Sequence, residues 1–432
     1  MTIGQEPLTR EAIANIEVGH TQVTPATAWC LVAVFLLFVC AVPAFELSGD
    51  RSGEAPWDHL RRIPERMHAP EIEQAALWPH IVLSNRVVLS GLHEFEEALE
   101  DASRAGTLLR PRAQQVMTRW LGAGNELAYI GRDGWLFYRP DVDYATSGGF
   151  LDAATQRRRA ASAQEWHNPP QTDPRKAIVQ LKQMLEAHGI TLVVMPTPLK
   201  PSIHPERLSG RAAKAPLPLD NPSSRQLVED LQSAGVHVFD PGAVMIESLR
   251  TGGAPQYLAT DTHWRPEAME LVAERLGEFI RMRVQLPYVD ALYQTQGTEI
   301  QRLGDIADML DLPDRQTLFV PEAVAIRRVV DLNGQPWRPA RDADVLLLGD
   351  SFSNIYSLAS MGWGDSAGLA EHLSFVLQRP VDRIVQNDKG SYATREILYR
   401  ERAERLKGKR VVIYQFAARE LAFGDWRLFE PM

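Results

Sequence analysis

A short apolar run, Val345-Leu346-Leu347-Leu348, ends abruptly at Gly349. A run with no polar side chain at any position is typical of a strand that is buried on both faces, as in a parallel sheet. Further short apolar runs alternate with helical patterns over most of the chain, and this alternation is typical of a parallel sheet covered by helices. The sequence therefore predicts an α/β fold with a doubly wound parallel sheet and helices on both faces.

The predicted elements follow the apolar periodicity of each segment. We predict helices at 174–188, 224–234, 266–281, 368–377 and 393–406, and strands at 190–195, 236–239, 345–348, 383–385 and 410–414. Ligands of such sheets bind at the carboxyl ends of the strands. The residues that follow each strand are therefore the first candidates for a functional site.

The strand at 345–348 leads into Gly349-Asp350-Ser351-Phe352-Ser353. Ser351 is thus expected at the carboxyl end of a strand and at the start of a helix that runs to about Ser360. Backbone N–H groups at this position can stabilise an oxyanion, so Ser351 is a candidate nucleophile. The alternative is that Ser351 or Ser353 only caps the helix.

A second motif, Asp261-Thr262-His263-Trp264, precedes a helix that is predicted to begin at Pro266. Asp261 can accept the Nδ1 proton of His263, which leaves Nε2 free as a base toward Ser351. A metal site at Asp261 and His263 would need at least one more ligand, and no His-rich or Cys-rich cluster follows, so we predict no metal. A purely structural role for His263 is the other alternative.

With both motifs, the chain resembles the alginate O-acetyltransferases of the AlgJ and AlgX type, whose catalytic domain is similar to SGNH hydrolases. The likeness extends from about Leu109 to Phe429. Both motifs carry the likeness, and so does their order, because the Asp and His precede the Ser. Further similar segments are 122–125, 131–138, 195–200, 303–307 and 411–421.

The resemblance implies that Ser351 is the nucleophile, His263 the base and Asp261 the orienting carboxylate. It also implies an acetyl-serine intermediate. Gly390 and Tyr392 follow the strand at 383–385, and glycine lets the backbone approach a ligand closely, so we predict oxyanion or substrate binding there. Gln415 and Arg419, at the end of the last strand, are predicted substrate contacts; structural or solvated roles are the alternative for all four residues.

The N-terminal region predicts a membrane anchor. Residues 26–45 carry no charged side chain and are numerous enough to cross a bilayer, and the acidic residues before them do not suit a cleaved signal peptide. We expect a short tail at 1–25, a transmembrane signal anchor at 26–45, a linker at about 46–71 within a linker and helical lead-in at 46–108, and the catalytic domain at 109–432. Arginines after the span weakly favour the opposite orientation, but the resemblance implies a single-pass protein of the bacterial inner membrane with its catalytic domain in the periplasm.

Composition excludes some functions. The net charge of −9 argues against nucleic-acid binding, and the two cysteines, Cys30 and Cys40, lie inside the predicted span, so neither can serve the catalytic domain. We interpret Arg157-Arg158-Arg159 as a solvated loop, with a basic groove for an anionic polymer as the alternative. The segment 135–138 is interpreted as core, with a sugar platform as the alternative. No cofactor is predicted.

We therefore predict an O-acetyltransferase that acts on an exported polysaccharide, alginate-like or another exopolysaccharide. The resemblance implies a multispanning membrane acyltransferase as the acetyl source and other polysaccharide export proteins as partners. Three alternatives stay open at this point: an acetyl esterase with the same triad, a non-catalytic scaffold of an export complex, and a subunit that passes acetyl groups to another transferase.

Overall fold

The structure is a computed structural model, and it describes residue 10 and residues 24–47, 56–161, 169–214, 217–289 and 292–429. The chain divides into two compact units, Met1–Leu109 and Arg110–Met432. Most of the predicted tail at 1–25 lies outside the described residues.

The N-terminal unit is helical. Its helices are α2 (Pro25–Leu47), α3 (Trp57–Met67), α4 (Pro70–Glu73) and α5 (Leu77–Asp101), and α6 (Arg104–Leu121) runs across the boundary between the units. α3 packs along α5, with the rings of Trp57 and Phe95 5.0 Å apart and Ile63 over Gly91, where any Cβ would collide with it. Among the helices that the structure describes, none combines the length and apolar character needed to cross a bilayer.

The larger unit is built on a five-stranded sheet in the order β4-β3-β9-β7-β8. Its strands are β3 (Thr191–Thr197), β4 (His237–Val238), β7 (Val345–Gly349), β8 (Asp382–Val385) and β9 (Val411–Ala417), and all neighbours are parallel. Every residue of β7 and β9 is buried. This burial on both faces explains why these two strands lack the alternation of apolar and polar residues that a half-exposed strand would show.

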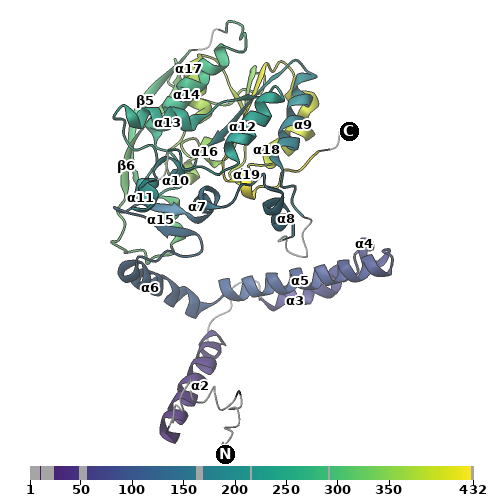
Figure 1. The fold of residues 1–432 in the computed structure, drawn as a ribbon, viewed down its shortest axis with the longest axis vertical. Helices are drawn as coiled ribbons and strands as arrows, with labels where there is room; N and C mark the ends of the chain where they lie inside the picture. The colour runs from purple at the N-terminus through teal and green to yellow at the C-terminus, as the bar shows by residue number, and fades with distance from the viewer. Residues whose placement is uncertain are drawn as a thin grey trace, which may run out of the picture. The chain divides into compact units, whose positions relative to one another are not determined.

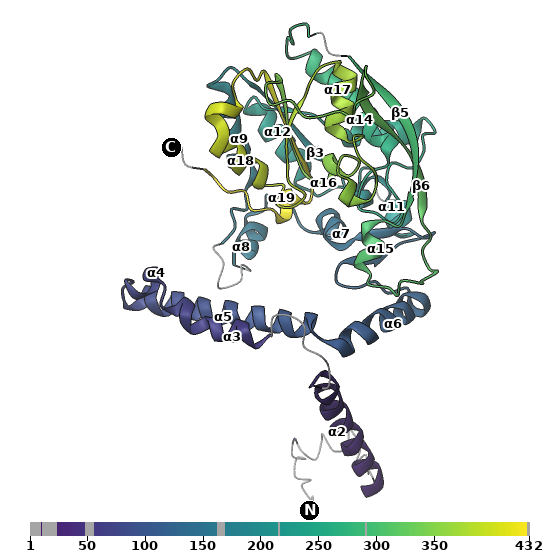
Figure 2. The same cartoon turned by 180° about the vertical axis from the view of Figure 1, so that it is seen from behind.

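Helices cover both faces of the sheet, as predicted (Figures 1 and 2). One group comprises α9 (Pro174–Glu186), α12 (Ser224–Ser233) and α18 (Ala393–Arg405), and the other comprises α13 (Pro241–Arg250), α14 (Pro266–Arg281) and α17 (Leu369–Leu377). Within the groups, α9 contacts α12, and α14 contacts both α13 and α17. The α/β fold with a parallel sheet is confirmed.

Shorter helices lie in the connections of the larger unit. They are α7 (Arg139–Thr146), α8 (Ala153–Ala161), α10 (Lys200–Ile203), α11 (Pro205–Leu208), α15 (Asp305–Met309), α16 (Ser351–Asn354) and α19 (Glu420–Phe423), with 3₁₀ turns η1 (Ala212–Lys214) and η2 (Ala359–Met361). α8 contains Arg157-Arg158-Arg159, so the prediction of a loop there is wrong, although Arg157 and Arg158 are exposed.

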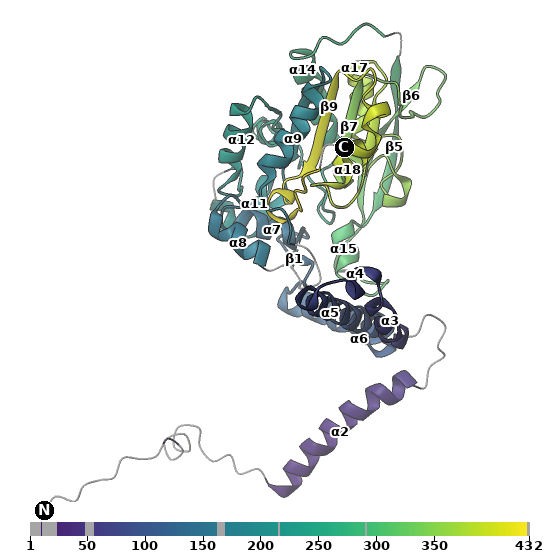
Figure 3. The same ribbon diagram turned by 90° about the vertical axis from the view of Figure 1, so that its right-hand side faces the viewer.

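Two antiparallel pairs were not predicted. β1 (Ala128–Ile130) and β2 (Leu136–Tyr138) form a hairpin whose turn places both Asp133 and Gly134 at positive φ, 54° and 79°. Positive φ at both central positions is the conformation of a type I′ turn, which favours Asp-Gly. β5 (Tyr293–Arg302) and β6 (Glu322–Asp331) form a long ribbon that packs on α14 and α17 (Figure 3).

Two further predictions need correction. The helix after Ser351 ends at Asn354 instead of reaching Ser360, so a strong helix dipole at Ser351 is not available. The predicted linker between residues 46 and 71 contains α3, because Leu60, Ile63 and Met67 recur at helical spacing and give α3 an apolar side against α5. By contrast, residues 135–137 are buried in the core, as predicted.

Candidate active site

Ser351 begins α16 directly after β7, at the carboxyl edge of the sheet. The turn is held by Asp350, whose Oδ1 accepts a hydrogen bond from the Phe352 N–H at 3.0 Å and whose Oδ2 accepts one from the Ala417 N–H at 2.6 Å. Gly349 is required here because a Cβ would lie 2.4 Å from Ser353 Oγ. The side chain of Asp350 thus fixes the backbone on which the Ser351 hydroxyl is mounted.

Gln415 of β9 supports the same turn from inside the sheet. Its Oε1 accepts hydrogen bonds from the Asp350 N–H at 3.0 Å and the Ser353 hydroxyl at 2.6 Å. Its Nε2 donates to Thr197 Oγ1 at 2.9 Å and to Asp350 Oδ1 at 2.8 Å. Gln415 was predicted as a substrate contact; in this structure its amide is buried and used by these four bonds, which connect it to the serine turn.

The Asp261–His263 pair forms as the motif spacing predicts. His263 Nδ1 lies 2.7 Å from Asp261 Oδ1, and the His263 backbone N–H donates to the same oxygen at 3.0 Å. Both side chains are buried. A carboxylate bonded at Nδ1 leaves Nε2 as the ring nitrogen that can accept a proton.

The histidine loop packs directly on the serine turn. Trp264 Nε1 donates to the Phe352 carbonyl at 3.1 Å, and the Tyr356 hydroxyl donates to the Trp264 carbonyl at 2.6 Å. The imidazole of His263 lies 4.8 Å from the Phe352 ring, centroid to centroid. Among the described residues, His263 Nε2 is buried and has no hydrogen-bond partner, Ser351 included. The two motifs, nearly ninety residues apart in the chain, are therefore neighbours in space.

Charge explains the protonation of this pair. Burial alone would lower the pKa of His263, but the hydrogen bond to Asp261 and the negative charges of Asp261 and Asp305 raise it above its ordinary value. Burial alone would raise the pKa of Asp261, but the bond to His263 and two backbone N–H donors hold it well below the ordinary value. Asp261 is therefore ionised and stabilises a protonated imidazole.

Two residues that the sequence analysis did not assign complete the Asp261 environment. Asp261 Oδ2 accepts from Trp363 Nε1 at 2.8 Å and from the Asp305 backbone N–H at 3.0 Å. Asp305 lies in the segment 303–307 that carried the resemblance, but only the folded structure brings it to the histidine loop. Trp363 follows a turn and is fully buried, with no local sequence signal for this contact.

Arg419, a predicted substrate contact, lies beside the serine turn. Its guanidinium is 6.0 Å from the centroid of the Phe352 ring and 5.3 Å from that of Tyr138. Its Nη1 donates to Asp141 Oδ1 at 2.9 Å, an ion pair that the sequence did not suggest. Burial raises the pKa of Asp141 and outweighs the charge of Arg419, and Asp141 Oδ2 is buried without a partner in the described structure. Asp141 thus holds Arg419 in place, with the charge of Arg419 close to the serine turn.

Gly390 and Tyr392 contact different parts of the structure. Gly390 packs on the serine turn, since a Cβ there would lie 3.4 Å from Asp350 Oδ2. In the described part of the chain, neither the Ser351 nor the Gly390 N–H donates to a backbone carbonyl. Tyr392 instead precedes α18, and its ring stacks under the Arg427 guanidinium at 4.0 Å. Oxyanion binding at Gly390 and substrate binding at Tyr392 stay predictions.

The structure supplies the third potential ligand that the metal alternative lacked, because Asp261, His263 and Asp305 offer ligand atoms within 4.8 Å of one another. The geometry favours a hydrogen-bonded pair of Asp261 and His263 instead. Two ligands of a Zn²⁺ ion, each about 2.0–2.2 Å from the metal in a tetrahedral site, lie farther apart than the 2.7 Å between Asp261 Oδ1 and His263 Nδ1. Both oxygens of Asp261 already accept two N–H bonds each.

Comparison with known proteins then decides the family. A family model described as the SGNH hydrolase-like domain of the acetyltransferase AlgX matches residues 128–418, which include both motifs and the whole sheet. The chain belongs to this AlgX-type family. A protein described as "Probable alginate O-acetylase AlgJ" from Pseudomonas aeruginosa is 29% identical over 187 residues, 42% of this chain and 41% of that protein. The protein of the same description from Pseudomonas syringae pv. tomato is 24% identical over 311 residues, 70% of this chain and 71% of that protein.

The chain thus spans about two fifths of the length of the first of these AlgJ relatives. Among solved structures, the O-acetyltransferase domain of Pseudomonas putida AlgJ aligns with a TM-score of 0.51 at 21% identity, covering 68% of this chain and 92% of that domain. This likeness concerns the fold. Membership of the AlgJ and AlgX family agrees with the resemblance found in the sequence.

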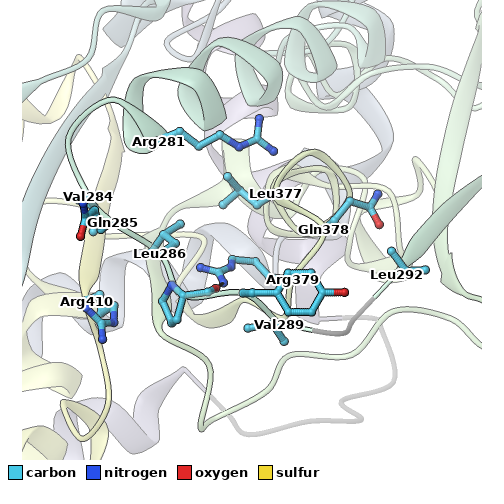
Figure 4. Close-up of a pocket in the computed structure, with 12 residues that line it drawn as sticks. Arg281, Val284, Gln285, Leu286, Val289, Leu292, Leu377, Gln378, Arg379 and Arg410 are labelled. Carbon is cyan, nitrogen blue, oxygen red and sulfur yellow. Dashed lines mark hydrogen bonds between the residues drawn. The ribbon is translucent and has the colours of Figure 1, made fainter.

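A large pocket of the protein lies away from Ser351. It measures about 670 Å³ and is lined by Arg281, Arg379 and Arg410 among others (Figure 4). Arg379 and Arg410 precede β8 and β9, so this pocket lies at the amino edge of the parallel sheet, opposite the serine turn. A second pocket, of about 520 Å³, lies at the carboxyl edge of the sheet, as the serine turn does. It is lined by Pro198 and Ala418, among others, which follow β3 and β9.

Proposed function

We propose that this protein transfers acetyl groups to hydroxyls of an exported polysaccharide through an acetyl-serine intermediate on Ser351. The observation that supports the proposal most is the packing of the Asp261–His263 loop on the serine turn, with Nε2 of His263 buried and unpartnered. Family membership supports the acetyltransferase class, and the name of the AlgJ relatives suggests alginate as one acceptor.

In the first half-reaction, Ser351 Oγ attacks the carbonyl carbon of an acetyl ester while His263 Nε2 takes the hydroxyl proton. Collapse of the tetrahedral intermediate breaks the bond to the donor alcohol, which leaves with the proton from His263. The Ser351 hydroxyl must approach Nε2 when the donor binds. Longer separations in substrate-free sites are common and tighten in the complex.

In the second half-reaction, a sugar hydroxyl attacks the acetyl-serine and gives its proton to His263 Nε2. The new ester leaves on the sugar, and Ser351 Oγ recovers the proton. The N–H groups of Ser351 and Gly390 are the proposed oxyanion donors, because neither is used by a backbone carbonyl in the described structure. Arg419 is proposed to contact the acceptor, since Asp141 holds its charge beside the serine turn.

We further propose that residues 26–45 anchor the protein in the bacterial inner membrane, with the catalytic domain in the periplasm. The uncharged composition of these residues supports the anchor. An acetyl-serine enzyme outside the cytoplasm needs an acetyl donor in that compartment. A multispanning membrane acyltransferase is the proposed source of the acetyl groups, and other polysaccharide export proteins are further proposed partners.

The proposal is tested by product analysis of the full chain in detergent with 4-nitrophenyl acetate and an oligomannuronate acceptor. We expect acetylated oligosaccharide from the wild-type protein and none from Ser351→Ala, as read by mass spectrometry. Release of free acetate at the same rate with and without acceptor would identify an esterase instead. Equal product from both proteins would contradict the role of Ser351.

A further inference from the structure

We propose that Asp305 is a positioning residue for the His263 base: it braces the 261–263 loop and places a second negative charge beside the imidazole. This inference rests on the proposed function but concerns a residue that neither motif contains. Asp305 begins α15, after a glycine that the loop requires. A Cβ on Gly304 would lie 2.4 Å from the backbone nitrogen of Asp261, so only glycine allows the close approach.

Asp305 binds the histidine loop with its backbone and its side chain. Its N–H donates to Asp261 Oδ2 at 3.0 Å. Its Oδ1 accepts from the Thr262 N–H at 2.6 Å and from the Thr262 hydroxyl at 3.0 Å. Thr262 lies between the two members of the proposed triad. Asp305 therefore fixes the segment that holds both Asp261 and His263.

The second oxygen of Asp305 acts through its charge. Asp305 Oδ2 lies 3.7 Å from His263 Nδ1, too long for a hydrogen bond but close enough for a strong attraction to an imidazolium. Its side chain is 34% exposed, so the attraction is moderated by solvent. Partial burial and the charge of Asp261 raise the pKa of Asp305 to about 6, so most of the Asp305 carboxyl is ionised at neutral pH.

Other charged groups surround this site and set the direction of the effect. Asp261 and Asp141 favour the protonated imidazole of His263, and Arg419, after β9, opposes it. The negative charges of Asp261 and Asp305 also stabilise the buried Lys200 ammonium of α10, and the charge of Asp305 acts on the Tyr138 hydroxyl. None of these groups is changed when Asp305 is replaced by asparagine. The loss of one negative charge then lowers the pKa of His263.

The direct test is a titration of His263 in the full chain, labelled with ¹³C at the histidine Cε1 positions and assigned with His263→Gln. In Asp305→Asn, which keeps an acceptor oxygen for Thr262, the His263 titration should move to lower pH. Asp308→Asn is the matched control, because Asp308 lies on the same helix but is exposed and faces Arg302 at 3.2 Å. An unchanged midpoint in Asp305→Asn, or an equal shift in the control, would overturn the proposal.

Kinetics provide the second readout. The acid limb of the pH profile of 4-nitrophenyl acetate turnover should move to lower pH in Asp305→Asn, with the plateau kept within about threefold.

Asp305→Ala also removes the acceptor for Thr262 and should lower the plateau kcat by roughly tenfold or more, since small displacements of a catalytic group are costly. A wild-type plateau in Asp305→Ala would overturn the brace. If the wild-type chain shows no turnover, the proposed function fails, whereas the titration still decides the role of Asp305.

Discussion

At the scale of single residues, the site is defined by how each polar atom near His263 is used. Asp261 accepts N–H bonds at both oxygens, and His263 Nδ1 is paired with Asp261. Of the two nitrogens of this imidazole, the buried Nε2 is the one without a partner among the described residues. A buried, unpaired nitrogen is costly unless a substrate or a moving hydroxyl uses it. This is the arrangement expected of a general base rather than of a structural histidine.

Replacing Asp261 by asparagine tests the orienting role. The amide cannot stabilise an imidazolium, and if its NH₂ group faces Nδ1 it imposes the wrong tautomer. We expect turnover of 4-nitrophenyl acetate to fall by roughly 10³–10⁴-fold. The free energy of unfolding should fall as well, because an NH₂ group replaces a buried oxygen that accepts two N–H bonds. Steady-state kinetics and thermal unfolding measure the two effects. A loss of less than about tenfold would contradict the proposed triad.

The pH dependence of turnover follows from the raised pKa of His263. The base is active when it is neutral, and a raised pKa keeps the imidazole protonated to higher pH. The acid limb of kcat/KM should therefore have its midpoint above the ordinary histidine value of about 6.5. A midpoint below this value in the wild-type protein would show that the carboxylates do not control the base.

At the scale of secondary-structure elements, the serine turn is held by three strands of the sheet. Gln415 of β9 connects the turn after β7 to Thr197 of β3. The turn therefore does not depend on the helix that follows, which explains how Ser351 is fixed although α16 contains four residues. Strand-end side chains provide the rigidity that a longer helix would otherwise give.

Replacing Gln415 by leucine should destabilise this junction. The change leaves buried polar groups of Asp350, Ser353 and Thr197 without their amide partners, at about 1–3 kcal/mol for each group. We expect the free energy of unfolding to fall by several kcal/mol and turnover to fall with it, as measured by denaturant titration and kinetics. Gln301→Leu on exposed β5 is the control and should change stability by less than about 0.5 kcal/mol. Equal effects of the two substitutions would contradict the role of Gln415.

The sequence predicted the elements whose burial pattern is local. The helix at 266–281 and the strand beginning at Val345 match the structure, because an apolar stripe or an unbroken apolar run encodes each of them. The β5–β6 ribbon was missed because its Gln- and Thr-rich strand β5 is largely exposed and carries little apolar signal. The contacts of Asp305, Trp363 and Asp141 were missed because they join segments far apart in the chain, which no local pattern records.

At the scale of the whole molecule, the two motifs, the sheet and the family match all lie in the larger unit, residues 110–432. The N-terminal unit, residues 1–109, contains the predicted anchor. Its proposed role is to hold the enzyme at a membrane, where a polysaccharide and an acetyl donor can be supplied together. This division separates chemistry from location, and each can be tested without the other.

The anchor is tested by fractionation of cells that express the full chain. We expect the protein in the membrane fraction after carbonate washing, and release of a Val34→Arg/Leu36→Arg variant, since each charge at the centre of a span costs about 2.5–3.5 kcal/mol. A C-terminal alkaline phosphatase fusion should be active, which would place the catalytic domain in the periplasm. Complete extraction of the wild-type protein by carbonate would contradict the anchor.

The central claim is that Ser351 carries the acetyl group, and intact-mass and peptide mass spectrometry test it most directly. The full chain is incubated with 4-nitrophenyl acetate beside Ser351→Ala, and each is then mixed with oligomannuronate. We predict one acetyl adduct on Ser351 that disappears when the acceptor is added and that the variant never forms, with turnover lower by roughly 10⁴-fold or more in the variant. The absence of an adduct on Ser351, together with equal turnover by the two proteins, would contradict the claim.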